Sequence, residues 1–223
     1  MSKYKIIEVK ESIFASNEKD ADALRLKLKQ DKCFLINVMS SPGSGKTTFL
    51  INLINRLKDK FKIGVMEADI DSDVDTSNVI KKTGVKAIQI HTGGACHLTA
   101  QMTSDALSEF DVSGLDLVFL ENVGNLVCPA EFDTGSHFNL CLLSIPEGDD
   151  KPLKYPLMFE VSNAVCITKL DTLPYFDFDL KAVENNIKLR NKKSDIFYLS
   201  AKTNEGMDKI AKYIESKVTE FKK

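Results

Sequence analysis

The chain has 223 residues, 43% hydrophobic and 28% charged, and a formal net charge of -2. This length is enough for one α/β domain with a full core and too short for two comfortable domains, and the near-neutral charge excludes the strong basic excess typical of nucleic-acid-binding proteins. No apolar run approaches the ~18 residues of a membrane helix and residues 1–10 lack a signal-peptide core, so we expect a cytoplasmic protein that binds neither nucleic acid nor membranes.

Short apolar runs alternate with longer amphipathic stretches. Residues 17–30 have helical periodicity, so we expect residues 1–30 to form an N-terminal helical extension to a single domain over 31–223. Strands are predicted at 34–39, 63–66, 87–90, 115–120, 138–145, 164–168 and 196–199, and helices at 47–60, 72–83, 96–110, 180–190 and 207–222. The polar segment 147–156 is expected to be a loop. The alternation indicates an α/β fold, with a mostly parallel central sheet and helices on both faces.

The segment SSPGSGKT, residues 40–47, follows the first predicted strand and opens a predicted helix, the setting of a phosphate-binding loop. Gly43 and Gly45 let the backbone curl and point its N–H groups at phosphate oxygens. Lys46 should reach the β- and γ-phosphates, and the Thr47 hydroxyl should bind Mg²⁺. Ser40 replaces the usual first glycine, a mild departure. The residues predicted to bind the phosphates are Pro42, Gly43, Ser44, Gly45, Lys46, Thr47 and Thr48.

Two later strings at predicted strand ends are candidates for binding the nucleotide base: TKLD, residues 168–171, and SAK, residues 200–202. The Asp171 carboxylate can accept from the N1–H and the 2-amino group of guanine, whereas adenine would offer it a lone pair. The stem of Lys169 should lie over the base, and the Ala201 N–H should donate to O6. Thr168 stands where such motifs usually have Asn. The predicted base site is Thr168, Lys169, Asp171, Ser200, Ala201 and Lys202.

Acidic residues after two strands are candidates for Mg²⁺ binding. Asp69 and Glu121 can hold the ion together with Thr47, directly or through water. The string ENVG, residues 121–124, resembles a switch whose glycine contacts the γ-phosphate, and Asp75 lies where the other switch would form. The alternative for residues 69–75 is a solvated acidic loop. The predicted catalytic set is Lys46, Thr47, Asp69, Asp75, Glu121 and Gly124.

The chain's three arginines, Arg25, Arg56 and Arg190, lie far from these motifs in the sequence. We therefore expect slow intrinsic hydrolysis of GTP to GDP and phosphate, because no arginine is placed to stabilise the transition state.

The cysteines number five and are irregularly spaced, which in a reducing compartment predicts free thiols or metal ligands. Cys96 and His97 lie in GGACHL, and Cys128 lies in NLVCPAEF, each after a predicted strand. Thiolate and imidazole suit Ni²⁺ or Zn²⁺, and three ligands leave a position for water or a second subunit. The spacing alone leaves open free cysteines beside a histidine. The remaining cysteines are expected in the core: Cys33, Cys141 and Cys166.

These strings occur in the order found in the HypB-type hydrogenase nickel-incorporation GTPases, which the chain resembles over about residues 33–221. The resemblance is most specific at ENVGNLVCPAEFD; the urease accessory GTPases share the phosphate loop but have a different metal motif. It implies a P-loop G domain and a GTP-hydrolysing metallochaperone that aids nickel insertion into nickel–iron hydrogenase. It also implies a GTP-dependent homodimer whose partners are a hydrogenase maturation protein and the hydrogenase large subunit.

The family's metal ligands correspond to Cys96, His97 and Cys128. Lys151 and Lys154 match positions in a charged loop, where they either meet phosphate or the partner subunit or are simply solvated. Some relatives carry an N-terminal cysteine cluster or a histidine-rich tail that this sequence lacks, so bulk nickel storage is not expected.

Other functions remain open at this stage. One is a regulatory GTPase with a structural zinc site, and another is a maturation factor for a different nickel enzyme. A P-loop phosphotransferase is disfavoured by the guanine motifs. For the metallochaperone we expect a nucleotide-gated switch: Cys128 lies four residues after Gly124, so a γ-phosphate contact at Gly124 would move Cys128 as well.

Overall fold

A computed structural model describes residues 9–69 and 74–223, with side chains from residue 14 onward in those ranges. The strands are β1 (Phe34–Ser40), β2 (Ile63–Asp69), β3 (Lys86–His91), β4 (Leu117–Glu121), β5 (Phe138–Ser144), β6 (Ala164–Thr168) and β7 (Asp195–Tyr198). The longer helices are α1 (Val9–Gln30), α2 (Lys46–Leu57), α3 (Val74–Thr83), α4 (Ala100–Phe110), α8 (Leu180–Arg190) and α9 (Met207–Phe221). The short ones are α5 (Cys128–Glu131), α6 (Lys151–Lys154) and α7 (Pro156–Glu160), with 3-10 turns η1 (Ile145–Glu147) and η2 (Leu170–Tyr175).

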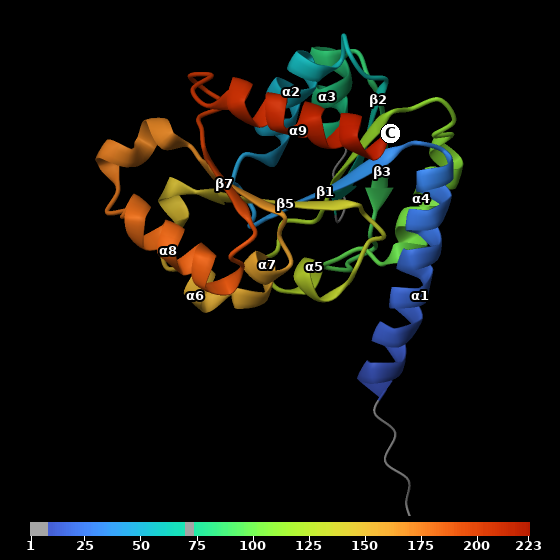
Figure 1. The fold of residues 1–223 in the computed structure, drawn as a ribbon, viewed down its shortest axis with the longest axis horizontal. Coiled ribbons are helices and arrows are strands. Elements are labelled where there is room, and N and C mark those ends of the chain that lie inside the picture. Colours follow the sequence, from blue (N-terminus) through green and yellow to red (C-terminus); the bar gives the residue numbers. More distant parts are fainter. Residues whose placement is uncertain (1–8, 70–73) are drawn as a thin grey trace, which may run out of the picture.

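The strands form one sheet of order β3-β2-β4-β1-β5-β6-β7, in which every neighbouring pair is parallel (Figure 1). This confirms the predicted fold class. β1 lies between β4 and β5, and all of its residues are buried. The carboxyl ends of β1, β2, β4 and β6 therefore meet at one edge of the sheet, where open α/β sheets bind their ligands. No helix in the described part of the chain is long and apolar enough to span a membrane.

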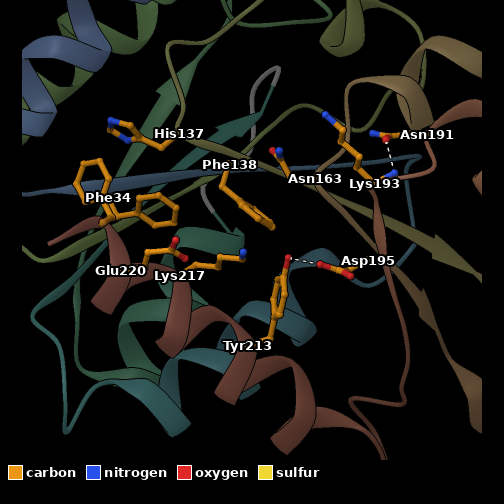
Figure 2. Close-up of a pocket in the computed structure, with 11 residues that line it drawn as sticks. Phe34, His137, Phe138, Asn163, Asn191, Lys193, Asp195, Tyr213, Lys217 and Glu220 are labelled. Atoms are coloured by element: carbon orange, nitrogen blue, oxygen red, sulfur yellow. Dashed lines mark hydrogen bonds between the residues drawn. The ribbon is translucent and has the colours of Figure 1, made fainter. Parts of the chain in front are cut away.

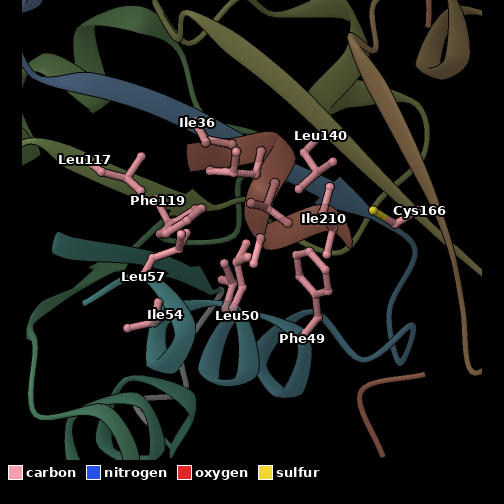
Figure 3. Packing of buried hydrophobic residues seen from close by; sticks show 14 of the residues in the cluster. Ile36, Phe49, Leu50, Ile54, Leu57, Leu117, Phe119, Leu140, Cys166 and Ile210 are labelled. Atoms are coloured by element: carbon pink, nitrogen blue, oxygen red, sulfur yellow. The ribbon is translucent and has the colours of Figure 1, made fainter. Parts of the chain in front are cut away.

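Side chains that alternate along each strand build a core on both faces of the sheet. On one face, α2, α3 and α9 pack against Ile36, Phe119 and Leu140, and Figure 3 shows Phe49, Leu50 and Ile210 meeting there. On the other face, α1 and α4 pack over β1, β2 and β4, while α5, α7 and α8 pack over β5 and β6. Successive side chains of a strand point to opposite faces, and helices cover both faces. The central strands are therefore apolar at nearly every position.

The predicted helix at 96–110 begins too early. α4 starts at Ala100, and Thr99 is its N-cap, with Oγ1 accepting from the Met102 N–H at 3.2 Å. Gly93 and Gly94 have φ of 60° and 95°, a left-handed backbone that suits glycine and turns the chain after β3. Residues 96–99 therefore lie in a loop before the helix.

The polar segment 147–156 is not the single loop that we predicted. It contains α6, and α7 begins at Pro156. Pro152 and Pro156 lie in the first turns of these helices, where proline's fixed φ is favourable, and the buried Met158 and Phe159 hold α7 against the sheet.

Other element ends differ less from prediction. α1 extends the predicted 17–30 helix back to Val9, and α3 matches the predicted 72–83 helix from Val74 onward, the residues 70–73 lying outside the described part. The fourth strand was predicted to begin at residue 115, but β4 begins at Leu117. Asp116 precedes the strand, and its carboxylate accepts a hydrogen bond from the Lys62 N–H at 2.8 Å.

Candidate functional site

The phosphate-binding loop connects β1 to α2. Gly43 and Gly45 have φ of 71° and 95°, so the loop uses the left-handed conformation that favours glycine. Lys46 is 9% exposed, and its Nζ donates to Ser40 Oγ at 3.1 Å. Ser44 Oγ also donates to Ser40 Oγ, at 2.6 Å. The residue that replaces the usual first glycine therefore holds the loop lysine in place.

Thr47 and Glu121 connect this loop to β4. The Thr47 hydroxyl donates to Glu121 Oε1 at 2.9 Å. Burial raises the pKa of Glu121 to about 7, opposed by the nearby Lys46 and by the Thr47 hydrogen bond. Burial also lowers the pKa of Lys46. Both groups are thus poorly solvated, as expected where a highly charged ligand is bound.

Three carboxylates gather beside Thr47. Oxygens of Glu67, Asp75 and Glu121 lie within 4.8 Å of one another. Glu67 was missed by the sequence analysis, although a charged residue within the apolar strand IGVMEAD was a usable signal. The predicted Asp69 ends the same strand, outside this group of three. Thr76 Oγ1 donates to Glu67 Oε2 at 3.1 Å and so ties α3 to β2.

This cluster has the chemistry of a magnesium site. Mg²⁺ prefers carboxylate and hydroxyl oxygens, which Thr47 and the three acidic residues supply. Glu121 Oε2 is buried, and no described residue forms a hydrogen bond with it, so the group fits a further positive ligand. Burial raises the pKa of Glu67 as well, which again indicates negative charge held away from water.

The segment after β4 lies directly against the phosphate loop. A Cβ added at Gly124 would come within 3.0 Å of both Pro42 Cα and Pro42 N. The Asn125 N–H donates to Ser40 O at 2.8 Å. A side chain here would need the Pro42 backbone to move by a few tenths of an ångström, so residues 121–125 lie in tight contact with the loop.

The predicted guanine motifs meet at a cavity of about 260 Å³ beside the loop. Its lining includes every predicted base residue: Thr168, Lys169, Asp171, Ser200, Ala201 and Lys202. Asp171 is oriented by Ser200, whose Oγ donates to Oδ1 at 2.6 Å. This leaves Oδ2 beside Lys202 Nζ, at 3.8 Å.

Thr168 and Lys169 both contact the phosphate loop. The Thr168 hydroxyl donates to Ser44 O at 3.1 Å and is buried, which is a bracing contact like the one expected of the usual Asn. Lys169 Nζ donates to Gly43 O at 2.7 Å, and its Cε lies 3.8 Å from a Cβ built on Gly45. The lysine stem therefore runs along the cavity wall between the loop and the base motifs.

Cys96, His97 and Cys128 come together at the same edge of the sheet. Cys96 Sγ lies 2.9 Å from Cys128 Sγ and 3.8 Å from His97 Nδ1. The three potential ligand atoms lie within 4.8 Å of one another, and all three residues are half-buried. The loop after β3 supplies the first two, and the N-terminal residue of α5 supplies the third.

The pKa values of His97 and Cys128 are shifted in the direction that favours their neutral forms. Burial lowers the pKa of His97, partly opposed by Glu131, and the hydrogen bond with Cys96 raises the pKa of Cys128. The His97 ring stacks on Phe132 at 3.9 Å between centroids, with 15° between planes. Neutral imidazole and two adjacent sulfurs form a ligand set for a borderline-soft divalent metal.

The remaining motif residues and arginines lie elsewhere. Lys154 pairs with Asp150, the N-cap residue of its own helix α6. Arg25, Arg56 and Arg190 contact Ser136, Asp208 and Pro152 respectively, away from the phosphate loop.

A larger hollow of about 420 Å³ lies at the opposite edge of the sheet, where β1, β5 and β7 begin. Figure 2 shows Phe34, Phe138 and Tyr213 around it, with the Tyr213 hydroxyl donating to Asp195 Oδ2 at 2.7 Å. None of the predicted site residues line this hollow.

Comparison with known proteins agrees with this geometry. Residues 34–198 match the family model described as "CobW/HypB/UreG, nucleotide-binding domain". The chain is 44% identical to the hydrogenase/urease maturation factor HypB of Helicobacter hepaticus over 217 residues, 96% of this chain and 88% of that protein. It is 40% identical to the hydrogenase maturation factor HypB of Escherichia coli over 216 residues, 97% of this chain and 74% of that protein.

A solved relative has the same fold. The crystal structure of HypB from Helicobacter pylori in complex with nickel superposes with a TM-score of 0.85 and 40% identity, covering 92% of this chain and 96% of that one. The phosphate loop, the base motifs and the cysteine–histidine strings thus lie on the fold that the resemblance implied. The chain belongs to the CobW/HypB/UreG family of nucleotide-binding domains and, within it, to the HypB hydrogenase maturation factors.

Proposed function

We propose that this chain is a GTP-hydrolysing metallochaperone that aids nickel insertion into nickel–iron hydrogenase, with metal binding and dimerisation controlled by the bound nucleotide. The observation that carries the proposal is the short path from phosphate loop to metal cluster. Glu121 bonds to Thr47, Gly124 lies against Pro42, and Cys128 follows four residues later.

The nucleotide part of the proposal assigns a role to each group. The phosphate loop and Lys46 bind the phosphates, and Asp171 selects guanine. Thr47, Glu67, Asp75 and Glu121 would hold Mg²⁺, which neutralises charge on the β- and γ-phosphates. The N–H of Gly124 donates to the γ-phosphate. Hydrolysis is slow, because the arginines are engaged elsewhere.

Nickel is the cargo of the second site, where Cys96, His97 and Cys128 are the ligands. Support comes from their mutual distances and from the nickel complex of the Helicobacter pylori relative. A γ-phosphate contact at Gly124 shifts the segment that leads to Cys128 and so changes metal affinity, because a ligand shifts an equilibrium only through differential affinity.

A homodimer fits the surface around the metal cluster. Val127, next to Cys128 in the chain, is 48% exposed, and Leu157 of α7, which lines a hollow together with Glu131 of α5, is 40% exposed. Exposed apolar side chains beside a cluster with an open coordination position favour a second copy there. Client proteins of the dimer are a hydrogenase maturation protein and the hydrogenase large subunit.

Nickel titration of wild type and a Cys96→Ala, Cys128→Ala variant tests the proposal, with each protein loaded with GDP or a non-hydrolysable GTP analogue and its mass measured by light scattering. We expect nickel binding to be lost in the variant, and in wild type both affinity and dimer content to depend on the nucleotide. Equal nickel affinity of the GDP and analogue states would contradict the switch. Unchanged nickel binding by the variant would show that these cysteines are not the metal ligands.

A further inference from the structure

The N-terminal helix α1 touches both chain segments that carry the candidate metal ligands. Asn17 is 6% exposed, and its side-chain amide uses both ends. Its Oδ1 accepts from the Ala100 N–H at 2.9 Å, and its Nδ2 donates to Asp133 O at 2.8 Å. Ala100 lies three residues after His97, and Asp133 lies five residues after Cys128. One side chain therefore bridges the two segments.

Aromatic rings make a second bridge from α1 to the cluster. Phe14 of α1 packs on Phe132, with ring centroids 4.9 Å apart. Phe132 stacks in turn on His97, at 3.9 Å between centroids. The three rings thus make a chain of contacts from α1 to His97, tilted by 40° at Phe14–Phe132 and stacked at Phe132–His97, and this packing limits the rotation of the imidazole.

The next turns of α1 fix it against the chain that follows Cys128. Arg25 pairs with Asp133 and donates from Nε to Ser136 O at 3.0 Å. A Cβ added at Gly135 would lie 2.7 Å from Leu24 Cδ2, so the backbone there approaches α1 as closely as glycine permits. Figure 1 shows α1 lying along α4, which begins at Ala100.

The ligand segments need such support because neither is held by a long element of its own. Cys96 and His97 lie in the loop before α4, and α5 has only four residues. Groups around a metal's ligands orient them, and their loss typically lowers metal affinity.

We propose that Asn17, Phe14 and Phe132 form a clamp that sets the spacing of the metal ligands, with Asn17 as its positioning residue. The inference rests on the proposed metal site and adds to it: α1 acts as part of that site, on a face away from the nucleotide. The clamp predicts that metal affinity depends on α1 contacts which GTP binding does not need.

Two variants break the clamp at different points. Asn17→Leu keeps the side-chain size but removes both hydrogen bonds, and Phe132→Ala removes the stack. We expect each to lower nickel affinity by about 10–100-fold and to weaken the thiolate-to-nickel charge-transfer absorption, while GDP affinity stays at the wild-type value. Phe132→Tyr retains the ring and should restore wild-type affinity.

Leu28→Ala is the matched control, because Leu28 is a buried residue of the same helix that lies about three turns beyond Asn17. It should destabilise the protein without changing nickel affinity. A metal-free measurement adds to this: the arsenical phenylarsine oxide bridges two close thiols, and its binding to the apoprotein should slow in Asn17→Leu.

Wild-type nickel affinity in both clamp variants would overturn the inference, and so would an equal loss in Leu28→Ala, which would assign the effect to general stability. The Cys96→Ala, Cys128→Ala variant separates the two levels of proposal. If it binds nickel as wild type does, the metal site itself is wrong. If it loses nickel while Asn17→Leu and Phe132→Ala keep it, only the clamp is wrong.

Discussion

Thr47 donates a hydrogen bond of 2.9 Å to Glu121 Oε1, across 74 residues of sequence. The contact joins the phosphate loop to the carboxyl end of β4, and the same segment continues to Gly124 and Cys128. In the proposed switch, a change in what Thr47 binds would act first on Glu121 and then on the segment that leads to Cys128. Four of the predictions below test this edge of the sheet.

Glu121→Gln should stabilise the nucleotide-free protein at pH 8. Burial raises the folded-state pKa of Glu121 from 4.5 to about 7, so the folded chain keeps a proton that the unfolded chain loses, and stability falls as the pH rises from 4.5 to about 7. The glutamine variant should therefore have a free energy of unfolding roughly 1–3 kcal/mol higher than that of wild type above pH 7, and nearly the same value at pH 4.5. Urea unfolding at both pH values measures this, and an equal effect at the two would contradict it.

The same variant should hydrolyse GTP at least about 10-fold more slowly, because a neutral amide holds Mg²⁺ less well than a carboxylate. Magnesium titration of the hydrolysis rate is the measurement. A rate and magnesium dependence equal to those of wild type would show that Glu121 takes no part in holding the ion.

Asp171→Asn should exchange the base preference. The amide offers a donor where guanine also has donors, so GTP affinity should fall by roughly 100-fold, while xanthosine triphosphate, which has an oxygen at C2, should bind better than to wild type. Lys202→Ala is the control: its Nζ lies 3.8 Å from Asp171, but the side chain is 84% exposed, so we expect a change below about 5-fold. Retained GTP affinity in the asparagine variant would exclude Asp171 from the base site.

Gly124→Ala should weaken binding of a GTP analogue more than binding of GDP. The added Cβ would lie 3.0 Å from the Pro42 backbone, so the segment must move away from the loop and from the γ-phosphate. We expect an additional loss of about 10-fold for the analogue, the size of one lost hydrogen bond to a charged group. Calorimetric titration with both nucleotides measures the difference. Equal losses would mean that the substitution only distorts the loop.

His137 should make stability depend on pH at the other edge of the sheet. Its Nδ1 accepts from the Leu35 N–H at 3.2 Å, which requires the neutral ring, and burial lowers its pKa from 6.5 to about 4. Between pH 6.5 and about 4, His137 therefore binds a proton in the unfolded chain but not in the folded one. The stabilisation that neutral His137 provides is complete above pH 6.5 and is lost as the pH falls to about 4.

His137→Gln removes this proton uptake, so the variant's free energy of unfolding should change less than that of wild type between pH 6.5 and 4. Chemical unfolding across that range is the measurement. Parallel curves for the two proteins would show that the His137 ring does not titrate as its contacts require.

The parts of the site that could be predicted from sequence depend on local strings. The loop of Gly43 to Thr47 follows a strand and opens a helix, and parallel topology alone brings Asp171 and Ser200 to the same edge. Each signal lies within a few residues, and the strand-end rule supplies the long-range step.

The parts that were missed depend on long-range or competing local effects. Apolar periodicity suggested a helix that begins at Cys96. The N-cap Thr99 instead starts α4 at Ala100, so Cys96 and His97 lie in the preceding loop. Glu67 is tolerated in a buried strand because Thr76, nine residues further along the chain, donates a hydrogen bond to its carboxyl group. Asn17 has no sequence signal at all, since its partners are 83 and 116 residues away.

Those separations determine when the metal cluster can assemble during folding. The groups that Asn17 bridges follow it in the chain by 83 and 116 residues, and contacts between residues so distant in sequence form slowly. Until Asp133 has been made, α1 and Cys96 are present but Asn17 lacks its partner in the second ligand segment. If the proposed metal site is correct, its two thiols reach their final spacing only after the chain has been made through Asp133, later than the local contacts within α1 and α4.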